Sequence, residues 1–212
     1  MVINMGLKSV SDDRVEEIRQ SIGSILKELL TKGSDEMETY FSTHTKEVVD
    51  EVYTLMQELY RRVHEAQEKG QFGKLSYVRV FPRRMAVIEG TYHFIIRVYD
   101  EAGYTNPMEI STEWRADFLA KLFEKQLLQV EKRVETQVFR LTTREQQLVK
   151  LMYADAFTFH VMAFLTILRT AFIYVENMTE VSCAERILLT FGNYLEEGAV
   201  IEVFENPGGV EA

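Results

Sequence analysis

The chain has 212 residues, of which 46% are hydrophobic, 11% aromatic and 27% charged, and its formal net charge is −9. This composition is typical of one folded, helix-rich globular domain and excludes an intrinsically disordered chain. The acidic balance argues against a protein whose partner is duplex nucleic acid, because contacts to phosphates need clustered Lys and Arg.

Two features lead us to expect a cytoplasmic location. Cys183 is the only cysteine, which excludes an intramolecular disulfide and suits a reducing compartment. Residues 1–10 have no charged segment followed by a long apolar run, so they do not resemble a secretory signal.

Residues 11–70 are predicted to form a helical hairpin. Apolar residues recur at alternating steps of three and four over 15–29, and a second stripe of this kind follows over 48–63. Gly33 is expected to end the first helix, and Gly70 the second.

Residues 74–100 differ from the rest of the chain in both pattern and charge. Apolar and polar residues alternate over 75–81 and 92–99, which is typical of β-strands. Between residues 71 and 100 there are five Lys and Arg against two Asp and Glu, a net charge of +3. Residues 85–89 fit either a third strand or a turn of helix.

Helices are predicted over residues 111–192. The first begins near residue 111, the second runs from residue 143 to about 176, and the third is short. Two capping boxes, in which a Ser or Thr and a Glu three residues later satisfy each other's backbone donors, precede the second and third helices. They are Thr142 with Glu145, and Ser182 with Glu185.

A final strand is expected at 199–205, before a flexible tail at 206–212. The order of elements predicts a single domain over residues 1–205. Its fold class is α+β and α-rich, with a long-helix bundle packed against a small antiparallel β-sheet.

The helix that begins at residue 143 is apolar on nearly every side between residues 152 and 175, and such a helix either spans a membrane or is buried in protein. Asp155 and Arg169 would each cost about 2.5 to 3.5 kcal/mol near the centre of a bilayer. We therefore predict a core or interface helix and no membrane association. Its polar seam would contain Asp155, Thr158, Thr166 and Arg169, with Tyr153 and His160 on the opposite, aromatic side.

No motif for catalysis or for a cofactor is present. The four His residues have no zinc-type spacing to one another, to Cys183 or to carboxylates, and there is no P-loop, dinucleotide-binding motif or nucleophile elbow. Cys183 would lie at a predicted helix N-terminus, where the helix dipole lowers a thiol pKa, although a buried core cysteine is the simpler interpretation. We predict no catalytic residue, metal or cofactor.

The basic strands could hold an anionic ligand or stack bases. If the strand phases are correct, Arg79 and Arg97 lie on one face beside tyrosines, with Arg83 and Arg84 at the turn. The structural alternative is that acidic residues around the last strand neutralise these arginines within the fold. Those residues are Glu196, Glu197, Glu202 and Glu205.

Two functional classes follow from these observations. The first is a non-catalytic interaction protein, homo-oligomeric through its apolar helices. The second is a small-molecule-binding or sensor domain, with an apolar or aromatic pocket near residues 151–175 or an anion site on the basic strands. An enzyme ranks last, because no motif supports one. The candidate ligand-binding residues are Arg79, Arg83, Arg84, His93, Arg97, Tyr153, Asp155, His160 and Arg169.

Overall fold

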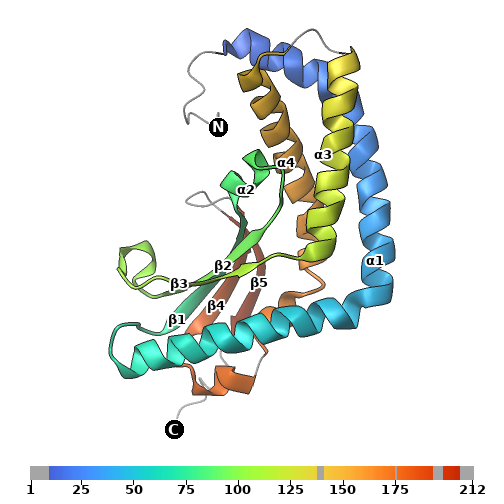
Figure 1. The fold of residues 1–212 in the computed structure, drawn as a ribbon. Helices are drawn as coiled ribbons and strands as arrows, with labels where there is room; N and C mark the ends of the chain where they lie inside the picture. The colour runs from blue at the N-terminus through green and yellow to red at the C-terminus, as the bar shows by residue number, and fades with distance from the viewer. Residues whose placement is uncertain (1–9, 138–140, 175, 193–197, 206–212) are drawn as a thin grey trace. The chain divides into compact units, whose positions relative to one another are not determined.

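The protein has an α-rich α+β fold, as predicted. The computed structural model describes residues 10–137, 141–174, 176–192 and 198–205, and these contain four α-helices and five β-strands (Figure 1). Their contacts group the chain into two compact units. The helical unit comprises Met1–Thr39, Arg84–Tyr92 and Asp117–Val161, and the sheet unit comprises Tyr40–Arg83, His93–Ala116 and Met162–Ala212. The single domain over residues 1–205 stays a prediction.

Helix α1 (Asp12–Glu68) consists of two helical segments that meet at a kink, and the turn near Gly33 that we predicted for a helical hairpin is absent. Gly33 does not end this helix. It lies where helix α3 (Asp117–Gln137) approaches, because a Cβ atom at position 33 would be 2.5 Å from Nε2 of Gln126. The glycine therefore permits close packing of two helices in the helical unit. From the sequence alone, a glycine with this role cannot be distinguished from a glycine that ends a helix.

Helix α1 is kinked at His44, within the sheet unit. The backbone there has φ −121° and ψ 17°, outside the helical range. Nδ1 of His44 lies 2.7 Å from the hydroxyl of Thr43 and 3.2 Å from the carbonyl oxygen of Tyr40. The His44 ring also stacks on the ring of Tyr40, with centroids 4.4 Å apart. Polar side chains that bond to preceding carbonyls compete with the helical hydrogen bonds and account for the kink.

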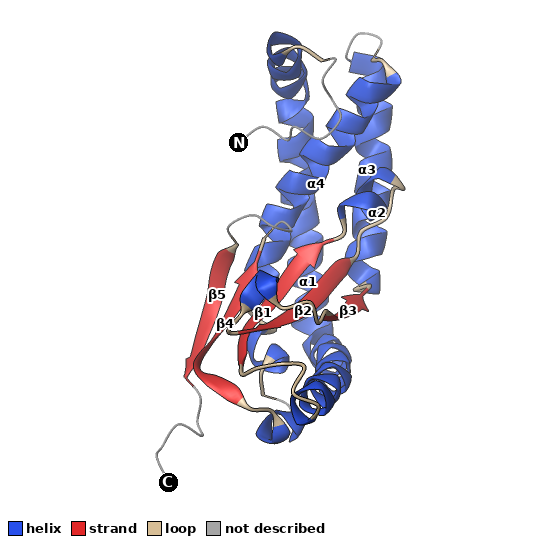
Figure 2. Cartoon of the chain, turned by 90° about the vertical axis from the view of Figure 1, so that its left-hand side faces the viewer, coloured by secondary structure: helices blue, strands red, loops and turns tan. Residues whose placement is uncertain are grey.

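The sheet unit contains a five-stranded sheet with the order β3-β2-β1-β4-β5 (Figure 2). Strands β1 (Leu75–Pro82) and β2 (Phe94–Asp100) pair antiparallel, as do β2 and β3 (Ile110–Trp114). Strand β4 (Cys183–Phe191) pairs parallel with β1 and antiparallel with β5 (Ala199–Glu205). The sheet is therefore mixed and larger than the antiparallel sheet that we predicted.

Two segments predicted as helix are strands. Residues Ile110–Trp114 form β3, so α3 begins only at Asp117. The Ser182 and Glu185 signature does not cap a helix, because β4 begins at Cys183. In β4, Ile187, Leu189 and Phe191 are buried in alternation, a period of two that decides for a strand once β1 and β5 supply backbone partners.

The segment that fitted either a strand or a turn of helix is helical. Residues Arg84–Ile88 form a short helix, α2. The predicted final strand at 199–205 is confirmed as β5. The predicted tail at 206–212 lies outside the described residues.

Helix α4 (Thr143–Leu165) begins with the predicted capping box. The backbone N–H of Thr142 donates to Glu145 Oε2 at 2.7 Å, and the N–H of Glu145 donates to Thr142 Oγ1 at 3.3 Å. The helix ends at Leu165 instead of near residue 176, and the short 3₁₀ segments Arg169–Phe172 and Glu176–Glu180 follow. The predicted polar seam therefore does not extend from Asp155 to Arg169.

Within the described residues, α4 is long and apolar enough to cross a membrane, with a mean hydropathy of 1.4 in its most apolar window. A core helix of a soluble protein passes the same test, so this property alone is weak evidence of a membrane span. Only 33% of that window is buried, which is less than a core helix requires.

Candidate functional site

Arg79 and Arg97 lie directly opposite each other on neighbouring strands of the sheet unit, and we call them the arginine pair. The registry also places Tyr77 opposite Tyr99, so the predicted strand phases are confirmed and these side chains share one face. Arg79 is 9% exposed and the Arg97 side chain 12%. Like charges at opposed positions destabilise a sheet unless other groups compensate them.

The arginine pair contacts the hairpin that connects β2 to β3. Arg97 forms an ion pair with Glu109, and its guanidinium lies 5.7 Å from the centre of the Phe81 ring. Arg79 donates a hydrogen bond to the hydroxyl of Tyr104. The Tyr104 ring packs on that of Tyr99, with centroids 4.8 Å apart. Burial raises the pKa of Tyr99 to about 12, although the charge of Arg97 opposes this shift.

Glu113 on β3 contacts two further candidate residues, His93 and Arg83. His93 Nδ1 lies 2.7 Å and Arg83 Nη1 3.3 Å from Glu113 Oε1. The hydrogen bond to His93, followed by that to Arg83, holds the pKa of Glu113 below its ordinary value, so this carboxyl is ionised at neutral pH. The side chain of Arg84 lies outside the described residues.

Among the described residues, Glu109 pairs with Arg97, and Glu113 pairs with Arg83 and His93. Glu202 of β5 instead pairs with Arg169, with Arg169 Nε 3.2 Å from Glu202 Oε2. Glu196 and Glu197 lie outside the described residues. The neutralisation of Arg79 by acidic residues around the last strand therefore stays a prediction.

The candidate residues on α4 point in different directions within the helical unit. Tyr153 is fully buried and donates to Oε1 of Gln126 at 2.7 Å, and burial raises its pKa well above the ordinary value. His160 is half-buried, with Nδ1 2.8 Å from the hydroxyl of Ser34 on α1. Asp155 is exposed. These three side chains do not converge on one point.

The contact between Ser34 and His160 resembles a nucleophile and its base, because such pairs lie about 2.6 to 3.2 Å apart. Both residues are inside long helices, α1 and α4, where backbone N–H groups already bond to carbonyls one turn earlier. Donors for an oxyanion are therefore not available from the neighbouring backbone. We interpret the pair as a hydrogen bond that links two helices. Sequence reasoning missed Ser34, since nothing local relates positions 126 residues apart.

Aromatic side chains pack against one another beside α4 in the helical unit, near part of the region for which a pocket was predicted. The ring of Tyr92 packs against those of Phe123 and Phe157, with centroids 4.9 and 5.0 Å apart. Its hydroxyl lies 2.6 Å from Oγ1 of Thr158. Edge-to-face and offset contacts of this kind stabilise a core, and here they join α3 and α4 within the helical unit.

The side of α4 that faces away from this core is apolar and accessible. Phe159 is 70% exposed, and Leu148, Leu151 and Met152 are half-buried. At about 100° per residue they lie opposite the buried Phe157. We call the side formed by Leu148, Leu151, Met152 and Phe159 the outer face of α4.

The depression on the surface of the helical unit and the acidic and histidine side chains do not form a recognisable site among the described residues. An open depression of about 430 Å³ lies along α1 in the helical unit. Its lining contains no candidate residue: Ser24, Lys27, Glu28, Thr31, Lys32 and Asp35. No group of three His, Cys, Asp or Glu side chains suited to a metal occurs among the described residues.

Cys183 does not lie at a helix N-terminus, as expected from the sequence, but on strand β4. Burial raises the pKa of its thiol to about 11, so the expected lowering of this pKa is wrong. The thiol therefore stays protonated at neutral pH and is a poor nucleophile.

Comparison with protein-family models, with curated proteins and with solved structures finds no match for this chain.

Proposed function

We propose that this chain is a non-catalytic interaction protein that self-associates through the outer face of α4. The observation that supports this proposal is the 70% exposure of Phe159 in the middle of the most apolar helix. Covering a Phe side chain contributes roughly 1.5 to 3 kcal/mol, so a surface of this kind favours association.

The chemistry of the other candidate residues supports a binding role more than catalysis. His160 bonds to a helical serine and Tyr153 to Gln126, while Cys183 has a raised pKa. None of these side chains belongs to a site in which a nucleophile, a base and hydrogen-bond donors for a developing charge lie together.

Sedimentation velocity of the full chain over a wide concentration range tests the proposal. The wild-type protein should shift from monomer to dimer or higher oligomer, and Phe159→Ser should move this transition to higher concentration. Met85→Ser is the matched control, because Met85 is 59% exposed in the helical unit but lies on the short helix α2. A wild-type protein that stays monomeric at every concentration would contradict the proposal.

Lipid vesicles test a competing partner for the same face. Flotation with phosphatidylcholine vesicles, with and without phosphatidylserine, should leave the protein unbound. Binding of a monomeric protein that Phe159→Ser abolishes would mean that a membrane covers this face, and the proposal would then be wrong.

A second candidate function is the binding of a small oxyanion at the arginine pair. The observation that favours it is that Arg79 and Arg97 are opposed positions on β1 and β2 and that both are largely buried. Inorganic phosphate should then raise the urea midpoint of the wild-type protein beyond the effect of sodium chloride at equal ionic strength. Equal effects of the two salts would remove this candidate.

A further inference from the structure

The loop that connects β2 to β3 places two of its side chains against the arginine pair. We call residues 101–109 the β2–β3 loop. Tyr104 of this loop accepts a hydrogen bond from Arg79. Glu109 of the same loop forms an ion pair with Arg97. The loop thus presents a hydroxyl oxygen and a carboxylate to the two guanidinium groups, and an oxyanion offers acceptors of the same kind.

The two loop side chains are far more accessible than the arginines that they contact. Tyr104 is 53% exposed and the Glu109 side chain 59%, whereas the arginine pair is largely buried. Ion pairs with an exposed partner contribute little to stability, and exposed side chains change rotamer rapidly. Both contacts can therefore be exchanged for contacts to a ligand without unfolding the sheet.

The backbone of the β2–β3 loop is held separately from these two side chains. Asp100, at the end of β2, is 4% exposed. Its carboxylate accepts from the backbone N–H of Gly73 at 2.9 Å and from that of Ala102 at 3.0 Å. The side-chain amide of Asn106 also donates to it. Because Asp100 anchors the loop, release of the arginine pair requires rotation of side chains and no rearrangement of the loop backbone.

The hydroxyl of Tyr99 is a third hydrogen-bond donor on this face of the sheet. The Tyr99 ring packs on that of Tyr104, and Arg97 lies two residues away on the same face of β2. The hydroxyl is buried and forms no hydrogen bond with another residue in the part of the chain that the structure describes. Buried hydroxyl groups normally have a hydrogen-bond partner, so this donor suits a bound acceptor beside the arginines.

Resting on the second candidate function, we infer that Tyr104 and Glu109 compete with a small oxyanion for the arginine pair and thereby set its affinity. When the anion binds, both side chains rotate into solvent, and the anion accepts hydrogen bonds from Arg79, Arg97 and Tyr99. The carboxylate of Glu109 has to leave, because two negative groups at one guanidinium repel each other. The apparent Kd is then the intrinsic Kd divided by the fraction of molecules in which the arginines are released.

Removal of each competing group tests the inference. Tyr104→Phe removes the hydroxyl and keeps the ring that packs on Tyr99, while Glu109→Gln removes the charge and keeps the shape. The rise of the urea midpoint with inorganic phosphate, at constant ionic strength, gives the apparent Kd of the full-length protein. This Kd should fall by about threefold in Tyr104→Phe and by about tenfold in Glu109→Gln, because a bond to a charged group is the stronger competitor.

Glu101→Gln and Tyr77→Phe are the matched controls. Glu101 is an exposed carboxylate in the same loop, and Tyr77 is 39% exposed on the same face of the sheet. Both controls should respond to phosphate as the wild type does. Adding Arg97→Lys to Glu109→Gln should abolish the gain, since an ammonium group cannot bind an oxyanion in the bidentate manner of a guanidinium. A gain that persists would place the phosphate elsewhere and overturn the inference.

The outcomes separate this inference from the site on which it rests. If phosphate and sodium chloride act equally on the wild type and on every variant, the oxyanion site and the competition are both wrong. If phosphate stabilises the wild type and every single variant equally, the site stands and the competition is wrong. A gain in Glu101→Gln as large as that in Glu109→Gln would mean that overall charge sets the affinity, which also overturns the inference. Larger responses of Tyr104→Phe and Glu109→Gln alone would establish it.

Discussion

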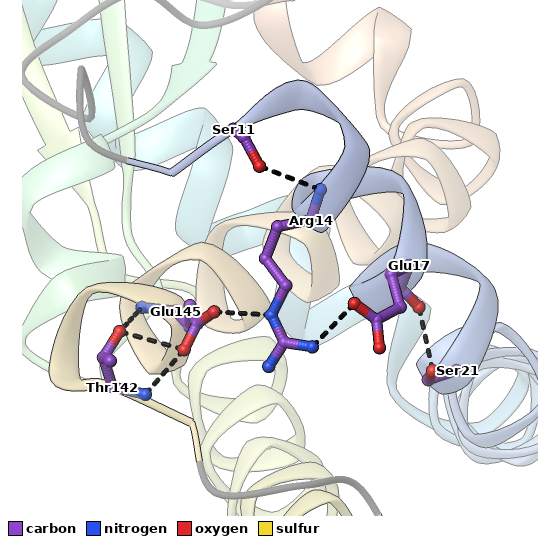
Figure 3. A network of polar contacts seen from close by, with 6 residues as sticks. All are labelled: Ser11, Arg14, Glu17, Ser21, Thr142 and Glu145. Carbon is purple, nitrogen blue, oxygen red and sulfur yellow. Dashed lines mark hydrogen bonds and ion pairs between the residues drawn. The ribbon is translucent and has the colours of Figure 1, made fainter.

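Arg14 and Glu145 are 131 residues apart in the chain, and Nε of Arg14 donates to Oε1 of Glu145 at 2.7 Å (Figure 3). The other carboxylate oxygen of Glu145 accepts from the backbone N–H of Thr142, and the Arg14 guanidinium also binds Glu17 at 2.8 Å. Ser11 caps the start of α1 through a bond from the backbone N–H of Arg14. One carboxylate thus joins the first turns of α1 and α4 in the helical unit.

Glu145→Ala should destabilise the protein by about 1 kcal/mol or more, because it removes the side chain that completes the α4 cap and leaves Arg14 without this partner. Urea unfolding followed by circular dichroism measures the change. Glu17→Ala is the control, since it removes the other carboxylate bound to Arg14 without touching a cap. Equal effects of the two substitutions would contradict the capping role.

Glu145 should also make stability depend on pH. The bond from Arg14, followed by that from the Thr142 backbone, holds the pKa of this carboxyl below its ordinary value of 4.5. The folded state therefore binds the proton more weakly, and the contribution is present above pH 4.5. It is lost as the pH falls through the folded pKa. The difference in unfolding free energy between wild type and Glu145→Gln should shrink on acidification. A constant difference would exclude the linkage.

Gly33→Ala and Gly23→Ala should have opposite effects, although both lie in α1. Alanine normally stabilises a helix by about 0.5 to 1 kcal/mol relative to glycine, and position 23 has no atom within 4 Å of the added Cβ. At position 33 the Cβ would meet the side-chain amide of Gln126, which is buried and accepts a hydrogen bond from Tyr153, so displacing this amide would cost that bond. Thermal unfolding should show a raised Tm for Gly23→Ala and a lowered Tm for Gly33→Ala.

Cys183 should react slowly with a thiol reagent such as iodoacetamide at neutral pH. Its pKa of about 11 leaves little thiolate in the folded protein, and its half-buried position limits access. The rate should rise as the pH approaches 11, and protein unfolded in urea should react much faster at neutral pH. Equal rates for folded and unfolded protein would contradict the raised pKa.

Much of the secondary structure could be predicted because it depends on neighbours in sequence. The capping box of Thr142 and Glu145 formed as expected, since both partners lie within one helical turn. The alternation in β2 correctly placed Arg97 and Tyr99 on one face. The strand phases placed Arg79 and Arg97 each on one face of its strand, whereas their direct opposition depends on the register of β1 and β2.

The tertiary structure decided whatever required a distant partner. Ser182 and Glu185 have the spacing of a cap, yet their segment became β4 because β1, far away in the chain, supplied its backbone hydrogen bonds. Gly33 lies inside α1 instead of ending a helix, and the absence of a side chain there leaves room for Gln126 of α3. Local composition sets periodicity and capping, whereas the pairing of strands and helices depends on packing between segments that no local pattern relates.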